Sequence, residues 1–420
     1  MTANTTSSSP GLAERYPVDY REHEGTRLEN DRLLLPISDE IRSGKNIEHL
    51  DRFAKAYLGL FLDIDNTIPP NDRINILANP ELAAEIKSGF EAILAKESFP
   101  GPEQIADSIY EDAYPEGYVL LAALDLFSDD PRYDFGKLSS KTIVAAICFH
   151  YAYQTEIQDK WFISAMQNNE KDVIRAFSRF WQQLIRHNTD HLPGLYQFID
   201  HHKYDHLSKQ LLLPVLATWT TVRKKILSKL LHTAIRTSDH DKMLAVCKTA
   251  LDSWNAAEPG RYILWLASAF ILAPEQYEAI LLDYSGRSKE KIIPLMDFVY
   301  LIFNDSEIHN LKMNSQALAT LLRIIAPKVT PQEDRYGQIC DNTRKVMYLF
   351  YLLATSRQPE KSEPDRVIKQ LKQVRVMKLY TPVLDFVQDL QQASTALTFD
   401  QFVKQLIERQ LIKSKIKRYD

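Results

Sequence analysis

Apolar residues recur every three or four positions in segment after segment of this chain, and this helical period is the feature that most limits its fold. Leu82, Ile86 and Phe90 form one such series. Asn79-Pro80 precedes it and is typical of a helix start, because an Asn side chain caps free backbone amides and Pro fits the first turn. Similar segments of roughly 10 to 20 residues continue from residue 46 to the end, joined by short links.

The chain contains few glycines, 12 in 420 residues, which is under half of the roughly 7% found in average proteins. Folds that rely on many tight turns or on backbone cradles for phosphate need more glycine than this. Strand-like alternation of apolar and polar residues does not recur between the helical segments. We therefore predict an all-α fold of antiparallel helices, namely a degenerate HEAT-like helical repeat, or α-solenoid.

Composition divides the chain into four predicted regions. Residues 1–45 are rich in Ser, Thr, Arg and Glu without a sustained apolar period, and they predict a mostly irregular N-terminal tail. Residues 46–355 form the predicted helical-repeat domain. The polar segment 356–364 contains two prolines and predicts a linker. Residues 365–420 then form a predicted C-terminal helical cap.

Charge is unevenly distributed along the chain. Residues 1–136 carry 12 lysines and arginines against 26 aspartates and glutamates, a net charge of −14, and the remainder carries 39 against 29, a net charge of +10. One interpretation is two solvated surfaces that attract each other, and the other is a basic surface for a partner, nucleic acid included. The candidate contacts to such a partner or to phosphate are Arg223, Lys224, Lys225, Lys229, Lys413, Lys415, Lys417 and Arg418.

The three cysteines, Cys148, Cys247 and Cys340, are dispersed and odd in number, which fits reduced thiols and neither a disulfide framework nor a thiolate metal site. The first residues lack the basic and apolar segments of a secretory signal. No apolar stretch reaches the roughly 20 residues that a membrane span requires. We expect a cytoplasmic protein with no cofactor and no membrane partner.

Residues 60–67, Leu-Phe-Leu-Asp-Ile-Asp-Asn-Thr, resemble the first motif of haloacid-dehalogenase-type phosphatases. The resemblance implies that Asp63 is the nucleophile and Asp65 the acid/base, with Mg²⁺ neutralising the phosphate. Asp129 and Asp130 would then supply metal ligands. This chemistry requires the motif at the end of a buried strand, with both aspartates presented to a loop.

The surrounding pattern favours a different setting for this motif. Apolar residues from Phe53 to Ile68 keep helical spacing straight through it. We therefore expect Asp63 and Asp65 on the polar side of a helix that Pro69 terminates.

Two histidine pairs have the i, i+4 spacing that places both rings on one face of an unbroken helix: His187 with His191, and His202 with His206. Four such ligands would satisfy zinc. However, Pro193-Gly194 interrupts the segment, and the glutamate of the His-Glu-x-x-His metalloprotease pattern is absent. We expect exposed histidines at polar helix ends and no metal site.

Short stretches of familiar composition are spread over residues 50–410. They are Gly-Arg-Tyr-Ile-Leu-Trp-Leu-Ala at 260–267, Leu-Ala-Pro-Glu-Gln-Tyr at 272–277, Gly-Tyr at 117–118 with Leu-Ala-Ala-Leu-Asp-Leu at 121–126, Leu-Pro-Gly-Leu-Tyr at 192–196 and Ser-Gly-Arg at 285–287. These stretches resemble the helical region that follows the NTPase module in bacterial NACHT-type (STAND) defence proteins. The resemblance implies a sensor or partner-binding arm and a role in defence against phage.

The NTPase module of that family is missing from this sequence. The Gly44-Lys45 pair is followed by Asn46, and no glycine-rich loop precedes it, so there is no P-loop. The arm would then act alone or with a separately encoded NTPase or effector.

We therefore expect a non-catalytic helical-repeat scaffold or sensor that binds a protein or nucleic-acid partner, in a bacterial antiviral defence system. Such repeats recognise partners through the long surface of their stacked helices. Two alternatives are a nucleic-acid-binding repeat that uses the basic C-terminal part, and a Mg²⁺-dependent phosphatase that uses Asp63.

Overall fold

The computed structural model describes most of the chain. The described residues are 23–61, 63–96, 98–110, 114–128, 130, 132–153, 160–200, 202–218, 222–253, 258–286, 288–304, 313–329, 341–355, 362–393 and 397–412. All regular elements in these ranges are α-helices or short 3-10 helices, and none is a strand. The all-α prediction is confirmed, and the helices pack on their neighbours in the manner of an α-solenoid.

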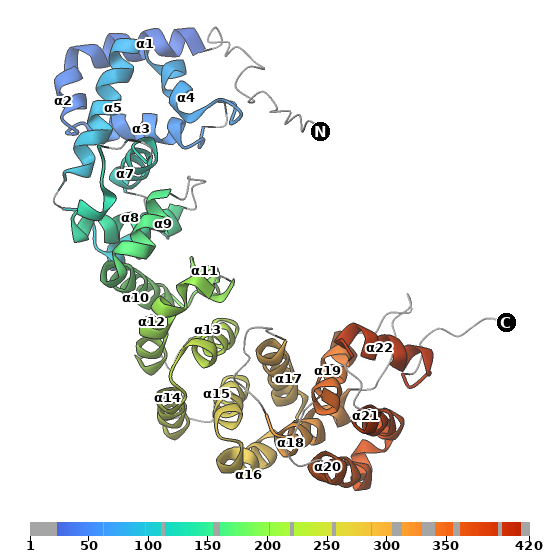
Figure 1. The fold of residues 1–420 in the computed structure, drawn as a ribbon. Helices are drawn as coiled ribbons and strands as arrows, with labels where there is room; N and C mark the ends of the chain where they lie inside the picture. The colour runs from blue at the N-terminus through green and yellow to red at the C-terminus, as the bar shows by residue number, and fades with distance from the viewer. Residues whose placement is uncertain are drawn as a thin grey trace, which may run out of the picture. The chain divides into compact units, whose positions relative to one another are not determined.

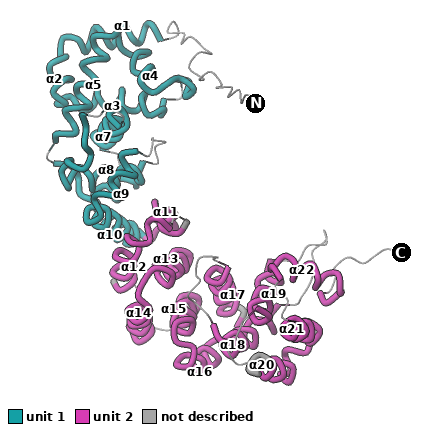
Figure 2. The backbone as a smooth tube through the Cα atoms, viewed as in Figure 1, with its two compact units in different colours: residues 1–187 teal, residues 188–420 magenta. Residues whose placement is uncertain are grey.

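The helices form two compact units, residues 1–187 and 188–420 (Figures 1 and 2). The first unit contains α1 (Glu24–Leu34), η3 (Leu35–Ile37), α2 (Ser38–Arg42), α3 (Ile47–Tyr57), α4 (Pro70–Leu77), α5 (Pro80–Leu94), α6 (Pro102–Asp107), α7 (Pro115–Leu126), η4 (Phe135–Lys137), α8 (Ser140–Tyr153), α9 (Lys160–Asn168) and α10 (Glu170–Arg186). Helices α7 and α8 are buried on almost every side, because α3 and α5 cover α7 while α6 and α10 cover α8.

The second unit is a two-layer stack of helices. It contains α11 (Leu195–Asp200), η5 (His202–Tyr204), α12 (Asp205–Thr218), α13 (Lys224–Thr237), α14 (His240–Asp252), α15 (Pro259–Leu272), α16 (Pro274–Ser285), α17 (Lys289–Phe303), α18 (Ser315–Ile325), η6 (Ala326–Lys328), α19 (Asp341–Thr355), α20 (Ser362–Gln373), η7 (Arg375–Tyr380), α21 (Thr381–Ala393) and α22 (Phe399–Glu408). In one layer α13, α15, α17, α19 and α21 each pack on the next, and α16, α18 and α20 form a second layer against them. This alternation is the arrangement of a helical repeat.

The prediction of an irregular N-terminal tail is wrong for residues 24–42, which form α1, η3 and α2. Residues 1–22 lie outside the described residues. The apolar pattern of α1 is weak because two of its leucines are exposed while the polar Asn30 is buried. The Asn30 side-chain amide donates to the carbonyl oxygen of Leu77 at 2.8 Å. A buried hydrogen bond, which apolar periodicity does not report, therefore fixes α1 to the end of α4.

The helix expected to continue to Ile68 is shorter than its apolar spacing predicts. Helix α3 ends at Tyr57, and Gly59 has a φ of +75°, a conformation that glycine adopts at little cost. The chain then forms a loop until α4 begins at Pro70.

Arg73, in α4, organises this loop. Its side chain is buried and donates hydrogen bonds to three backbone carbonyl groups. The acceptors are the carbonyl oxygens of Tyr57, Asn66 and Ile68, at 2.9, 2.8 and 2.8 Å. These bonds satisfy acceptors that have no helical partner once α3 has ended.

The boundary between compact units lies after residue 187, whereas the sequence predicted a break at 356–364. Residues 356–361 lie outside the described residues, and α20 already begins at Ser362. Because α20 packs on α18 and α21 packs on α19, the predicted cap continues the stack of the second unit. Proline in the first turn of a helix is tolerated, so Pro364 does not break the chain there.

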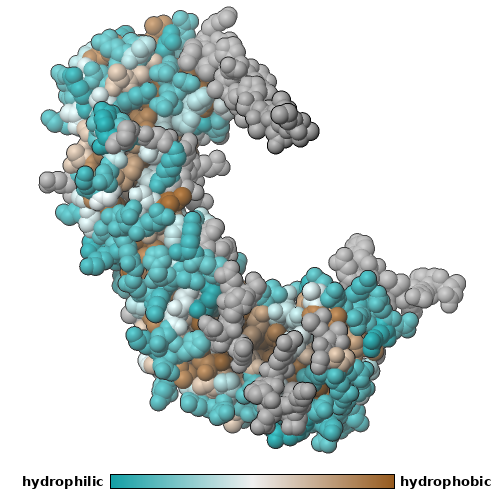
Figure 3. All heavy atoms as spheres, viewed as in Figure 1, coloured by the Kyte–Doolittle hydropathy of each residue, from teal (hydrophilic) through white to brown (hydrophobic). Residues whose placement is uncertain are grey.

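The face of the molecule drawn in Figure 3 is mainly hydrophilic, with apolar atoms in small areas and in a hollow over α17. Among the described residues no helix is both long and apolar enough to cross a bilayer.

Candidate ligand pocket in the second unit

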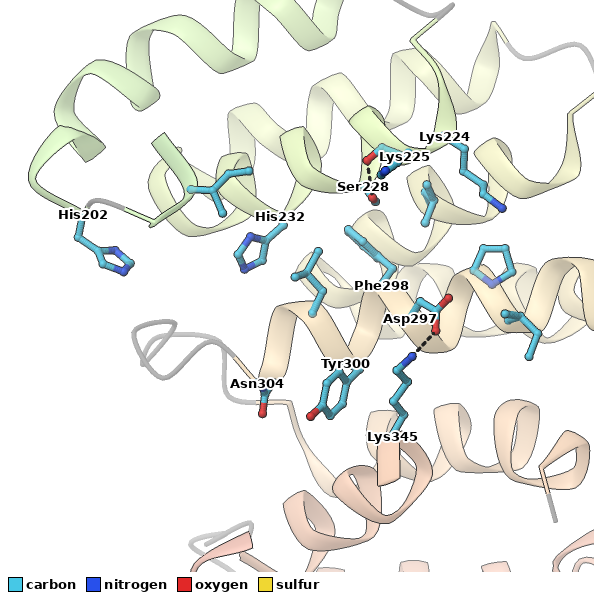
Figure 4. A pocket seen from close by; sticks show the side chains of 15 residues that line it. His202, Lys224, Lys225, Ser228, His232, Asp297, Phe298, Tyr300, Asn304 and Lys345 are labelled. Carbon is cyan, nitrogen blue, oxygen red and sulfur yellow. Dashed lines mark hydrogen bonds and ion pairs between the residues drawn. The ribbon is translucent and has the colours of Figure 1, made fainter. Parts of the chain in front are cut away.

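A cavity of about 750 Å³ lies between helices of the second unit (Figure 4). Two of its walls come from α13 and α17, and α11, η5, α15 and α19 contribute one residue each. The lining residues are Ile199, His202, Lys224, Lys225, Ser228, His232, Leu264, Ile293, Pro294, Asp297, Phe298, Tyr300, Leu301, Asn304 and Lys345. Sites for small ligands have volumes of about 300–1,000 Å³, so the cavity has the size of a binding site.

The α13 wall is basic at its N-terminal end. Lys224 and Lys225 are the first two residues of the helix, and Ser228 and His232 follow on the same face at helical spacing. The first turn contains no acidic residue. Because the positive end of the helix dipole lies at the N-terminus, lysines there oppose it and strengthen the positive potential at this edge of the cavity.

Both lysines are available to a ligand. They are exposed, and neither forms an ion pair with another described residue. The Lys224 stem lies beside Gly260 of α15, where a Cβ atom would stand 3.1 Å from Lys224 Cδ. A glycine at this position therefore leaves room for the lysine along the edge of the cavity.

The cation on the opposite wall, Lys345, is paired with two carboxylates. Lys345 Nζ lies 3.0 Å from Asp297 Oδ1 and 2.5 Å from Asp341 Oδ2. Burial lowers the pKa of Lys345, but its hydrogen bonds to the two carboxylates outweigh this effect and raise the pKa above its ordinary value. Lys345 is thus charged and paired, so among the described lining residues Lys224 and Lys225 are the lysines available to an anion.

Apolar side chains complete the cavity. Leu264 and Phe298 are buried in its walls, and Leu301 is 36% exposed. Pro294 lies inside α17, where it cannot donate a backbone hydrogen bond to Glu290, so one helical hydrogen bond is absent at the cavity wall. An apolar wall next to free cations suits a ligand that has both an anionic group and an apolar part.

Of the predicted contacts that the structure describes, Lys224 and Lys225 line the cavity, and Arg223 and Lys229 do not. Arg223 precedes α13 and pairs with Asp190. Lys229 is exposed on α13 but does not line the cavity. The remaining predicted contacts, Lys413, Lys415, Lys417 and Arg418, lie outside the described residues.

His191 responds to the positive charges of α13. Burial is the main cause that lowers its pKa below the ordinary value of 6.5, and Lys229 and Lys225 lower the pKa further by repelling the imidazolium. The pKa of His191 therefore depends in part on the charges of these lysines.

The predicted histidine pairs do not form a metal site. His187 follows the end of α10 in the first unit, and its Nε2 lies 2.6 Å from Asp107 Oδ1. His202 belongs to η5 and His206 to α12, so this pair does not share one helix. In the described part of the chain no group of three His, Cys, Asp or Glu side chains could hold a metal ion. Of the three cysteines, Cys148 and Cys247 are buried free thiols, and Cys340 lies outside the described residues.

Asp63 and Asp65 are exposed in the loop between α3 and α4, and not on the helix that the sequence predicted. The backbone amide of Thr67 donates to Asp65 Oδ1 at 2.8 Å and lowers the pKa of that carboxyl group. The residues described before this loop are helical, so the strand end that phosphatase chemistry requires is not found there. Asp130 pairs with Arg132, while Asp129 lies outside the described residues.

Sequence reasoning missed the α17 wall and Lys345. One signal was present: Pro294 and Asp297 both interrupt the apolar run that follows Lys291 in α17. No local signal places Lys345 beside Asp297, because the two residues are 48 positions apart.

No protein-family model, curated protein or solved structure matches this chain.

Proposed function

We propose that this chain is a non-catalytic helical-repeat scaffold or sensor whose second unit binds an acidic and apolar segment of a partner protein. The observation that carries this proposal is that Lys224 and Lys225, at the edge of a cavity with apolar walls, are exposed and form no ion pair with another described residue. A partner carboxylate would bind the lysines, and a neighbouring aliphatic or aromatic side chain would fill the cavity beside Phe298.

A protein segment fits these features better than a nucleic-acid backbone does. Nucleic-acid binding draws its affinity from many phosphate contacts in a row. Among the described residues that line this cavity only two lysines lack an ion-pair partner, and Asp297 adds a negative charge to the lining. A phosphate backbone would bury little apolar surface against Leu264 and Phe298. An apolar side chain placed there would be removed from water, which favours binding.

Selection from a library of random short peptides on the full-length protein tests the proposal. We expect the enriched peptides to combine Asp or Glu with aliphatic or aromatic residues. Their affinity, measured by fluorescence anisotropy, should fall by more than about tenfold in the K224E/K225E variant, because each reversed charge repels the peptide.

The matched control is K242E/K248E, which makes the same charge change on exposed positions of α14. This variant should bind the peptides like the natural protein. Peptides without acidic residues, or equal losses in the two variants, would contradict the proposal. Retention of oligothymidylate that depends on Lys224 and Lys225 would instead establish the nucleic-acid alternative.

The biological setting that we propose is a bacterial antiviral defence system in the cytoplasm, with a separately encoded NTPase or effector as the partner. This part rests on the resemblance to NACHT-type proteins. Co-expression with the products of neighbouring genes tests it: we expect a complex that K224E/K225E disrupts and K242E/K248E preserves. If no neighbouring product forms such a complex, the proposed setting is wrong.

A further inference from the structure

The 3-10 helix η7, Arg375–Tyr380, presents two different exposed faces next to each other. A 3-10 helix has three residues per turn, so residues three positions apart lie directly above one another. Arg375 and Lys378 form one face, and Val376 and Leu379 form the next. A six-residue 3-10 helix is long for this type, and here it extends both faces over two turns.

The third face of η7 is anchored in the core of the second unit. Met377 and Tyr380 are fully buried. The Tyr380 hydroxyl donates to the carbonyl oxygen of Val329, and its ring stacks on Phe350 at a centroid distance of 5.2 Å. These contacts fix the rotation of η7, so its other two faces must point outward.

The aliphatic face is unusually exposed. Val376 keeps 45% of its surface accessible to solvent and Leu379 keeps 56%. Single exposed aliphatic residues are common on proteins. Two that are stacked on one ridge and bordered by cations form a surface in which apolar burial and charge attraction act together.

More cations lie on the adjoining helix. Arg366 and Lys369 are exposed on α20, which packs on η7. We refer to these two residues and to Arg375 and Lys378, on adjoining elements, as the basic cluster; all four are exposed, and none has an ion-pair partner among the described residues. Lys372, by contrast, is paired with Asp385 at 2.6 Å and is not part of this cluster.

We propose that η7 is a peripheral membrane-binding ridge that inserts Val376 and Leu379 into the interface of an anionic bilayer while the basic cluster contacts lipid head groups. Charge complementarity and the exposed aliphatic pair are the two signals that stable peripheral binding needs. Unlike a protein interface, a bilayer requires no matching groove or large contact area to bury two side chains. A nucleic acid would leave the aliphatic pair unused, because its bases stack on aromatic groups.

Because its apolar residues alternate with cations along the sequence, this surface does not form the continuous apolar stretch of a membrane-spanning helix. It is also separate from the peptide pocket, with which it shares no residue. Membrane binding by η7 can therefore be tested independently of peptide binding in the pocket.

Co-sedimentation of the full chain with vesicles of phosphatidylcholine, with and without phosphatidylserine, tests the ridge. We expect binding only to the vesicles that contain phosphatidylserine, and binding that weakens as salt rises. Each cation near an anionic surface contributes about fivefold to partitioning, so R375E/K378E should reduce binding by more than about tenfold. V376S/L379S should also reduce binding by about tenfold while leaving the salt dependence in place.

K242E/K248E again serves as the charge-matched control and should bind the vesicles like the natural protein. All substituted side chains are exposed, and unchanged thermal unfolding by circular dichroism confirms that each variant folds. The proposal is overturned by absence of phosphatidylserine-dependent binding, by equal losses in R375E/K378E and the control, or by full binding of V376S/L379S. Loss of oligonucleotide binding in R375E/K378E without loss of vesicle binding would also overturn it and assign the cluster to nucleic acid.

Discussion

The carbonyl oxygen of Ile41 approaches Gly89 so closely that a Cβ atom on Gly89 would stand 2.3 Å from it. This approach joins α2 to α5, and Leu50 of α3 packs against the same position, with Cδ2 at 2.8 Å from the hypothetical Cβ. Only glycine permits three helices of the first unit to meet this closely.

Gly89→Ala should therefore lower the free energy of unfolding by about 2 kcal/mol, because α2 must move away from α5 to admit the methyl group. Urea denaturation followed by circular dichroism measures the change. Gly25→Ala is the matched control: a Cβ there meets nothing within 4 Å, and Ala favours the helix. If both substitutions changed the free energy of unfolding equally, the predicted effect of the close contact at Gly89 would be wrong.

Arg73→Met should lower the free energy of unfolding by about 3 kcal/mol, because three backbone carbonyl groups lose a charged donor in a partly buried loop. The same urea experiment applies. Arg42→Met is the control, since Arg42 is half exposed and its surface ion pairs are worth less than about 1 kcal/mol. Equal stability of Arg73→Met and the natural protein would show that the loop does not depend on this arginine.

The pKa of His191 should lie below 6.5 and should rise when the charge at position 225 is removed. Because the folded state binds this proton less readily than the unfolded chain, the contribution of His191 to stability is complete above pH 6.5 and is lost as the pH falls below it. An NMR titration of the imidazole in natural protein and in Lys225→Gln measures the shift. An acidic peptide in the pocket should raise the pKa in the same direction, and a titration that neither change moves would contradict the predicted proximity.

Asp297→Asn should tighten binding of acidic peptides several-fold, because it removes a negative charge from the cavity and releases Lys345 from one partner. Anisotropy titrations with the selected peptides measure the change. Asp283→Asn, which alters an exposed residue of α16 outside the cavity, should leave the affinity unchanged. Weaker binding by Asp297→Asn would place the peptide's anionic group elsewhere.

Sequence patterns predicted those helices whose signals are local. Asn79-Pro80 predicted the start of α5, and the Asn79 side chain accepts a hydrogen bond from the amide of Leu82 at 2.8 Å. The patterns gave wrong predictions where a hydrogen bond to a residue distant in the sequence determines the local structure. Asn30 fixes α1 through a carbonyl 47 residues away, and Arg73 stabilises a loop where the apolar spacing predicted a helix.

For the pocket, too, local sequence signals indicated some of the residues but not how they are brought together. Lys224 and Lys225 were identifiable from the sequence because a basic pair interrupts an apolar stretch. Their position beside Phe298 and Asp297 follows from the packing of α13, α15 and α17, which no local pattern specifies.

A charge-swap titration tests the central claim most directly. We take a selected acidic peptide and its counterpart with lysine in place of each acidic residue, and measure both against the natural protein and K224E/K225E. The predicted result is that the acidic peptide binds only the natural protein and the basic peptide binds only the variant. Binding of the acidic peptide to both proteins, or of the basic peptide to neither, would contradict a role for Lys224 and Lys225 in recognition.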